Sequence, residues 1–231
     1  NCKKLTSVSL PKNISSLGSS AFNGCSALNT VTFHFNNTVT NTSTGEELYK
    51  VTIGSSAFTD CISLTKIEWT ENIISIGNSA FAGCSALTEE TLPDRITSIG
   101  NYAFSGCSSL RSLTLPEELK ELGYNFLEGT KVSYLKIPKK LTYSCTRLSL
   151  DGPCEGALEL KKVEFEEGMT AIPGNTCSSR DHASYIEEII LPESIKTIGE
   201  NAFRNCKKLT SVSLPKNISS IARSEERFSR N

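Results

Sequence analysis

The sequence has no long apolar run. None of its segments approaches the roughly 20 consecutive apolar residues that a membrane-spanning helix needs. The first residues, Asn1 to Lys4, are not followed by a hydrophobic stretch of the signal-peptide type. We therefore expect no membrane insertion of this segment, and export can be neither read from it nor excluded.

An excess of positive charge is also missing. The 231-residue chain carries 24 lysines and arginines against 25 aspartates and glutamates, which gives a formal net charge of -1. Binding to nucleic acid or to an anionic membrane surface depends on a surplus of basic residues. The composition therefore argues against nucleic acid as a partner.

Motifs that carry catalysis or hold metals are absent as well. The sequence contains no G-x-S-x-G elbow, no phosphate-binding glycine loop, no dinucleotide fingerprint and no His-Glu metalloprotease motif. It has no C-x-x-C pair, and its two histidines, His34 and His182, stand in irregular segments without paired ligands nearby. We therefore expect no enzyme activity, no cofactor and no metal.

Acidic pairs are the one feature that points toward hydrolysis. A pair of carboxylates is what glycoside hydrolysis uses, and three such pairs occur, at Glu117–Glu118, Glu166–Glu167 and Glu187–Glu188. All three fall at positions expected to point outward from strands and turns. Solvated charges are ordinary there, and we prefer that interpretation.

What the sequence does have is an internal repeat of 23 residues. Each unit follows the template C-x-x-L-x-x-V-x-L-P-x-x-I-x-x-I-G-x-x-A-F-x-x-C. The template recurs from Cys2, from Cys61 and from Cys84, and late in the chain it returns from Ile186 to Cys206 and continues to Ile221. Residues 1–16 are identical to residues 205–220, which indicates recent duplication. Self-similarity at a fixed period of this length is the signature of a repeat architecture.

The spacing of the apolar residues predicts a parallel β-solenoid. Val8 and Leu10 alternate with polar residues as a half-buried strand requires, and Pro11 then ends the strand. Equivalent strands of successive units would stack about 4.8 Å apart in a right-handed, curved superhelix of about nine coils. The Ile-Gly segment would return along another side, and the Ala-Phe segment would form a short helical or 3-10 turn.

Three stretches depart from the template. An insertion of 13 residues falls within 34–50 and predicts a protruding loop, which is either a tolerated insertion, as we prefer, or a contact loop. Residues 130–185 are irregular, but strand patterns on both sides of 143–157 favour one domain over residues 1–231. Residues 222–231 diverge from the template, and we expect this tail to fray or to form a polar cap.

Most of the nine cysteines share one template position. They should form a buried column of small side chains: Cys2, Cys25, Cys61, Cys84, Cys107 and Cys206. Three others, Cys145, Cys154 and Cys177, lie outside this column in the irregular region. One disulfide among those three is possible if the protein is exported.

One inward position contradicts the pattern. Glu90 stands where Val8 and Ile67 point into the core. Either the strand is locally shifted, or this carboxylate escapes to solvent through a bulge.

The repeat resembles the BspA-like leucine-rich repeats. The resemblance rests on runs such as Ile99-Gly100 through Cys107 and Leu110 to Leu115-Pro116, and it covers most of the chain. Proline follows the strand where the commonest leucine-rich repeats have asparagine or cysteine. The resemblance implies a secreted or cell-surface protein of a host-associated microbe that adheres to host matrix proteins, host cells or other microbes. It transfers no particular functional residue.

The outward strand residues are the candidate binding surface. Those of the early units are mostly serine and threonine and favour plain soluble surface, whereas the later units mix aromatic, apolar and charged groups, as protein-binding patches do. The candidate partner-binding residues are Lys66, Glu68, Arg111, Tyr134, Lys136, Lys161, Lys162, Glu164, Glu187, Glu188 and Ile190. Two functions stay open: an adhesion module that binds a protein or a glycan, and a passive repeat spacer.

Overall fold

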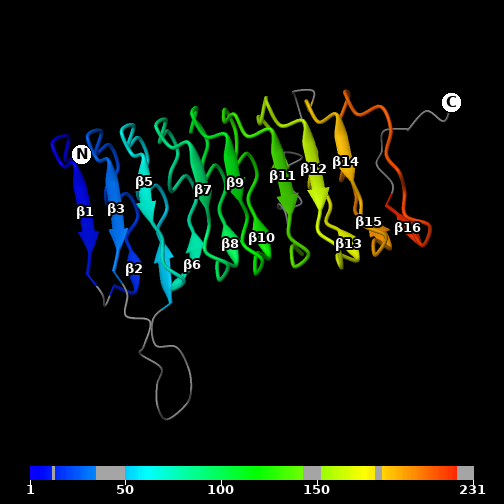
Figure 1. Cartoon of the computed structure of the whole chain (residues 1–231), viewed down its shortest axis with the longest axis horizontal. Coiled ribbons are helices and arrows are strands. Elements are labelled where there is room, and N and C mark those ends of the chain that lie inside the picture. Colours follow the sequence, from blue (N-terminus) through cyan, green and yellow to red (C-terminus); the bar gives the residue numbers. More distant parts are fainter. Residues whose placement is uncertain (12–13, 35–49, 143–151, 180–183, 223–231) are drawn as a thin grey trace, which may run out of the picture.

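A computed structural model describes residues 1–11, 14–34, 50–142, 152–179 and 184–222. The predicted insertion loop, the predicted tail and part of the irregular region, including Cys145, lie outside these described residues almost entirely. The described coils stack side by side in a long row, with β1 (Ser7–Leu10) at one end and β16 (Ser220–Ile221) at the other (Figure 1).

A first row of parallel strands runs along the stack, one strand per coil (Figure 1). Inward side chains such as Val31 and Leu135 are fully buried, and their neighbours along the strand point to solvent. This alternation follows from the two-residue period of a strand. The strands of this row are β1 (Ser7–Leu10), β3 (Thr30–Phe33), β5 (Lys66–Glu68), β7 (Glu89–Thr91), β9 (Ser112–Thr114), β11 (Tyr134–Ile137), β12 (Lys162–Phe165) and β14 (Glu188–Ile190).

Eight coils contribute to this row, one fewer than the period predicts. The ninth expected strand, at residues 209–214, is not formed, and Leu214 leaves 50% of its surface exposed. Hydrogen bonding also divides the row into three sheets, β1-β3-β5, β7-β9 and β11-β12-β14.

A second row of shorter strands forms another side of the solenoid. Its members also pair in parallel, as Ile76 with Ile99 and Ile99 with Leu122. They form two sheets, one from β2 to β10 and one from β13 to β16. The strands of this row are β2 (Ser16–Leu17), β4 (Val51–Ile53), β6 (Ile73–Ile76), β8 (Ser98–Ile99), β10 (Glu121–Leu122), β13 (Ala171–Ile172), β15 (Thr197–Ile198) and β16 (Ser220–Ile221).

The Ala-Phe segments form turns on the third side, and the described residues contain no helix. The expected short helical turn is therefore not formed as a helix. Some backbone N–H groups of the segment close turns within it, and the others bond to the next coil. The N–H of Cys61 closes a turn on the carbonyl of Phe58 at 3.2 Å, while the N–H of Phe58 donates to the carbonyl of Ala80 at 2.8 Å. Ser56, which precedes Ala57, has a φ of 55°, and this left-handed step keeps the turn from continuing as a helix.

Phenylalanine side chains from these turns stack in the interior. Phe22, Phe58, Phe81 and Phe104 form one column with ring centroids 5.4, 5.2 and 5.4 Å apart and nearly parallel planes. The rings of Phe58, Phe81 and Phe104 are fully buried. Burial of side chains of this size is the main source of stability in such a stack.

Glycines beside the second row allow the coils to approach closely. A Cβ placed on Gly77 would lie 2.7 Å from the backbone N of Ser55 in the preceding coil, and one on Gly100 would lie 2.5 Å from the backbone N of Asn78. These contacts are too short for any side chain. The template therefore needs glycine here for space between coils.

The cysteine column is buried in its central part. Cys25, Cys61, Cys84 and Cys107 are buried, and the thiol of Cys84 donates to the carbonyl of Phe58 in the preceding coil at 3.2 Å. Burial raises the pKa of Cys61 to about 11 and that of Cys107 to about 12. The prediction is wrong at the two end positions, because Cys2 is exposed and Cys206 is only partly buried where no further coil covers them.

Candidate interaction surface

The third sheet of the first row brings the candidate residues of the later coils together. Pairing of β11, β12 and β14 aligns Tyr134 with Lys162 and Glu188, and it aligns Lys136 with Glu164 and Ile190. All six therefore project from the outer face of three hydrogen-bonded strands. Their role in binding a partner stays a prediction.

Side-chain contacts link neighbouring strands of this sheet. The hydroxyl of Tyr134 donates to Oε2 of Glu164 at 2.8 Å, and Nζ of Lys162 lies 3.0 Å from Oε1 of Glu188. Partial burial, followed by the hydrogen bond to Glu164, raises the pKa of Tyr134 to about 12. The tyrosine hydroxyl therefore links β11 to β12 by a side-chain hydrogen bond.

The other candidate residues are placed differently. Lys66 and Glu68 form an exposed ion pair of 2.6 Å on β5, in the first sheet, and this contact lowers the pKa of Glu68. They do not join the six residues of the third sheet. The remaining three lie just before their strands rather than on them: Arg111 before β9, Lys161 before β12 and Glu187 before β14.

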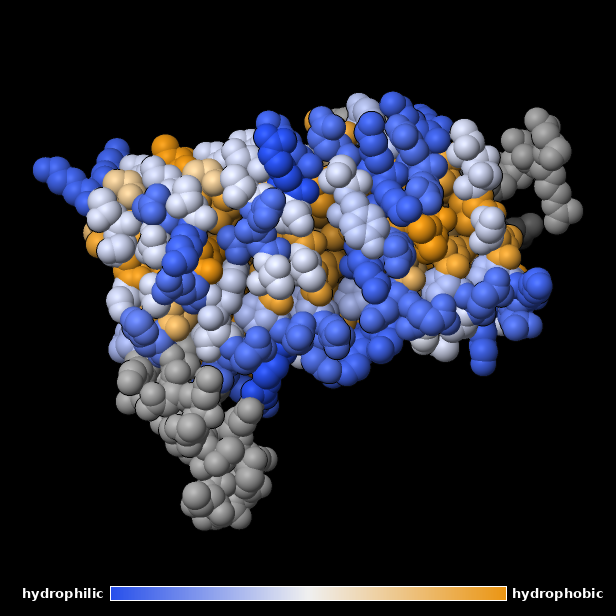
Figure 2. All heavy atoms as spheres, viewed as in Figure 1, coloured by the Kyte–Doolittle hydropathy of each residue, from blue (hydrophilic) through white to orange (hydrophobic). Residues whose placement is uncertain are grey.

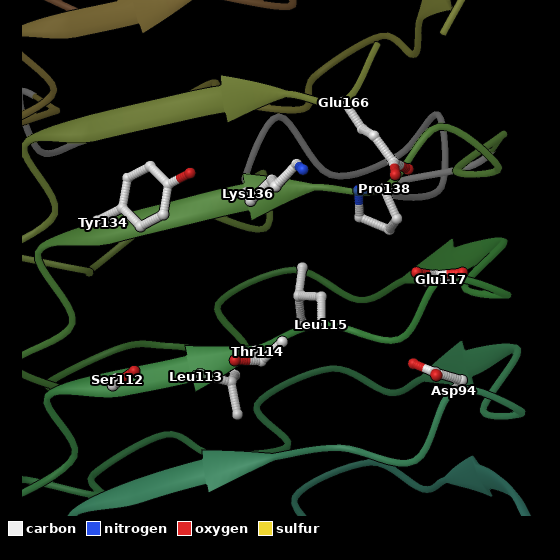
Figure 3. Close-up of a pocket in the computed structure, with 10 residues that line it drawn as sticks. All are labelled: Asp94, Ser112, Leu113, Thr114, Leu115, Glu117, Tyr134, Lys136, Pro138 and Glu166. Atoms are coloured by element: carbon white, nitrogen blue, oxygen red, sulfur yellow. The ribbon is translucent and has the colours of Figure 1, made fainter. Parts of the chain in front are cut away.

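A groove opens where the second and third sheets meet. Strand pairing does not join β9 to β11, although the N–H of Lys131 still donates to the carbonyl of Leu110 at 2.8 Å just before the two strands. The groove has a volume of about 340 Å³, and Figure 3 shows Tyr134 and Lys136 on one side and Ser112 and Thr114 on the other. Its lining comprises Asp94, Ser112, Leu113, Thr114, Leu115, Glu117, Tyr134, Lys136, Pro138 and Glu166.

Three carboxylates stand at the end of this groove. Asp94, Glu117 and Glu166 lie beyond the ends of the strands (Figure 3). Glu166 accepts a hydrogen bond of 2.9 Å from the N–H of Lys139. The two glutamates were predicted to be solvated charges, and Asp94 was not among the predicted residues. The repeat could have predicted that Asp94 and Glu117 lie close together, because both directly follow the proline of the template.

A second break in the first row lies between β5 and β7, where Glu90 resides. Neither predicted alternative is right, because β7 pairs with β9 in regular register and Glu90 stays buried. Its Oε2 accepts a hydrogen bond of 2.6 Å from Nε1 of Trp69 across the break. Burial raises the pKa of Glu90 to about 7, and the bond from Trp69 offsets part of that effect.

The outer face is mixed in character. Figure 2 shows hydrophilic and apolar side chains interleaved over this side of the molecule. Among the residues that the structure describes, no three His, Cys, Asp or Glu side chains lie close enough to share a metal ion. The described part of the chain also holds no helix with the length and apolar character to cross a membrane.

Comparison with known proteins identifies the repeat. A family model described as BspA type leucine rich repeat region matches in six copies, over residues 1–46, 48–148 and 155–229. The fold is similar to that of a leucine rich cell surface protein from Faecalibacterium prausnitzii A2-165, with a TM-score of 0.54, 23% identity, and coverage of 94% of this chain and 69% of that chain. It is also similar to a T. pallidum leucine rich repeat protein, with a TM-score of 0.50, 20% identity, and coverage of 89% and 78%. No curated protein matches the sequence.

Proposed function

The chain belongs to the BspA-type leucine-rich repeat family, and from this premise we propose that it is a non-enzymatic binding module of a secreted or cell-surface protein. Its partner is a protein or glycan of a host matrix or cell surface. The partner docks on the outer face of β9, β11, β12 and β14. Leucine-rich repeats generally serve protein interaction.

The observation that carries the proposal is the groove between β9 and β11 with Tyr134 beside it. Tyr134 leaves 43% of its surface exposed while its hydroxyl is held by Glu164. A half-exposed aromatic ring beside a groove, with its hydroxyl hydrogen-bonded, is the kind of anchor on which binding energy concentrates. Hydroxyls and carboxylates around it supply the polar contacts that give specificity.

The alternative function is a passive spacer. It is favoured by the first coils, where Ser7 and Ser9 on β1 and Thr30 and Thr32 on β3 present only small polar side chains. A stack whose coils contact only their neighbours also holds its two ends apart at a defined distance. Neither point accounts for the groove, and we therefore prefer the binding module.

A binding screen tests the proposal. The purified chain is passed over matrix proteins and glycans, and the affinity for any ligand found is compared with that of Tyr134→Ala and Lys136→Ala. Loss of the Tyr134 ring should weaken binding by at least about tenfold, as expected for an aromatic anchor. Tyr185→Ala is the matched control, because Tyr185 leaves 40% of its surface exposed outside the groove.

Each outcome of the screen has a definite meaning. No binding to any protein or glycan supports the spacer. Binding that both groove variants leave unchanged would place the contact surface elsewhere. Turnover of a glycan by the purified chain would contradict the non-enzymatic assignment.

A further inference from the structure

Two thiols occupy the phenylalanine position of adjacent coils. The N–H of Ala157 closes a turn on the carbonyl of Cys154, just as the N–H of Cys107 does on that of Phe104. The N–H of Cys177 donates to the carbonyl of Ala202 in the next coil, which repeats the bond that Phe58 makes to Ala80. Cys154 and Cys177 therefore replace two stacked rings of the interior column.

The two sulfur atoms face each other. Sγ of Cys154 lies 3.9 Å from Sγ of Cys177, and the two residues expose only 6% and 0% of their surface. A disulfide needs a separation of about 2.05 Å, which small rotations about the two Cα–Cβ bonds can provide. Both side chains are much smaller than the phenylalanine rings that occupy this position in other coils.

The other described thiols are directed elsewhere. Cys84 and Cys107 are also 23 residues apart in adjacent coils, but each donates to a phenylalanine carbonyl of the preceding coil at 3.2 Å. The thiol of Cys206, the nearest competitor, donates to the carbonyl of Cys177 at 3.4 Å. Among the hydrogen bonds of the described residues, a thiol-to-thiol contact occurs at Cys154 and Cys177 alone.

We propose that Cys154 and Cys177 are an oxidation site and form a disulfide in the presence of a small-molecule disulfide or a thiol-disulfide oxidoreductase. One cysteine loses its proton and attacks the sulfur–sulfur bond of the oxidant, which releases one thiol and leaves a mixed disulfide. The second cysteine loses its proton, attacks the mixed disulfide and releases the second thiol. Two electrons pass from the two cysteines to the oxidant, and the two protons leave on its thiols.

Burial determines when this reaction occurs. The hydrogen bond with Cys154, followed by burial, raises the pKa of Cys177, and only a thiolate attacks a disulfide. Oxidation therefore accompanies folding or opening of these coils. The product ties the turn that precedes β12 in the chain to the turn that precedes β14, and both strands belong to the candidate interaction surface.

Peptide mapping tests the inference and does not depend on which partner the module binds. The chain is refolded in oxidised or in reduced glutathione, unreacted thiols are alkylated after denaturation, and the digest is analysed by mass spectrometry without reduction. We expect a linked peptide that contains Cys154 and Cys177 and is lighter by two hydrogen atoms. Cys84 and Cys107, the matched pair, should both be alkylated.

Thermal unfolding gives a second readout. The oxidised chain should melt on the order of 5 °C above the reduced chain, because the cross-link restricts the unfolded state. The double variant Cys154→Ala/Cys177→Ala should melt at one temperature in both buffers. Alkylation of both cysteines after oxidative refolding, or linkage of either one to Cys145 or Cys206, would overturn the proposal. The peptide map of the unmodified chain shows whether the disulfide forms even if the double variant does not fold.

Discussion

The indole N–H of Trp69 donates a hydrogen bond of 2.6 Å to the carboxylate of Glu90, across a break in the first row of strands. Trp69 itself packs edge-on against Phe81, with centroids 5.6 Å apart, and stacks on Phe33 at 6.4 Å. A buried carboxyl group is thus attached to the aromatic interior by one neutral donor. The shifted pKa of Glu90 reflects its burial and the hydrogen bond from Trp69, and no positively charged residue among the described ones contributes to it.

Glu90→Gln should remove a pH-dependent loss of stability. The pKa of Glu90 rises from 4.5 to about 7 on folding, so between these values the folded chain holds a proton that the unfolded chain has lost. The free energy of unfolding therefore falls as pH rises from about 4.5 to 7, by at most about 3 kcal/mol, and stays lower above pH 7. The glutamine amide keeps an acceptor for Trp69 and cannot ionise.

Thermal melts from pH 4 to pH 8 check this expectation. The variant should melt several degrees above the unmodified chain at pH 8, and the difference should vanish near pH 4. Cys107 is the other titratable group that faces Glu90, and its thiol stays protonated across this range. Glu89→Gln, at the exposed neighbouring position, is the control and should retain the slope. Parallel pH profiles for both variants would show that Glu90 is not the source.

Gly77→Ala should destabilise the stack, whereas Gly18→Ala should not. An added Cβ at position 77 meets the backbone of the preceding coil at 2.7 Å, and backbone cannot move aside as a flexible side chain can. Overpacking of this kind costs about 1–3 kcal/mol. Gly18 holds the same template position in the first coil and has nothing within 4 Å. Equal melting temperatures for the two variants would contradict the close approach of the coils.

Thiol labelling should separate the exposed cysteine from the column. Cys2 is exposed and should react rapidly with a bulky thiol reagent at pH 8, whereas Cys61, Cys84 and Cys107 should react only after denaturation. Burial both blocks access to these three and raises their pKa, which keeps them as unreactive thiols. Rapid labelling of Cys84 in the folded chain would mean that the column is not closed.

Phe81→Ala should be among the most damaging single substitutions. The ring of Phe81 contacts those of Phe58, Phe104 and Trp69, and its removal should cost about 3–5 kcal/mol. Phe81→Leu should cost clearly less, because Leu127 already occupies this position in the coil that follows Phe104. Chemical denaturation of both variants measures the difference. Equal losses for alanine and leucine would indicate that ring stacking, rather than filled volume, stabilises the column.

The repeat made most of the fold predictable. One period aligns Val8 with Val31, and the structure pairs these two residues in parallel strands. The phenylalanine and cysteine columns follow from the same alignment, because equal positions in successive coils must stack. The outward orientation of the six residues of β11, β12 and β14 could also be predicted, since two-residue alternation determines which side chains face solvent.

Breaks in the row of strands were not predictable in the same way. The sequence marks Glu90 as unusual, but only the packed structure shows that Trp69 supplies a donor and that the charge stays inside. The groove between β9 and β11 depends on a small divergence of two strands whose sequences both fit the template. Cys154 and Cys177 lie in the irregular region, so their place in the phenylalanine column appears only from their backbone hydrogen bonds.

Because the hydrogen bonds between coils run along the axis of the stack, mechanical load on that axis strains one coil boundary at a time. A pull from the ends should peel the chain open in steps rather than break it at a single high force. Each step would free 23 residues, or roughly 75 Å of extended chain. A module built in this way would lengthen stepwise under force, while the coils that have not yet opened stay folded.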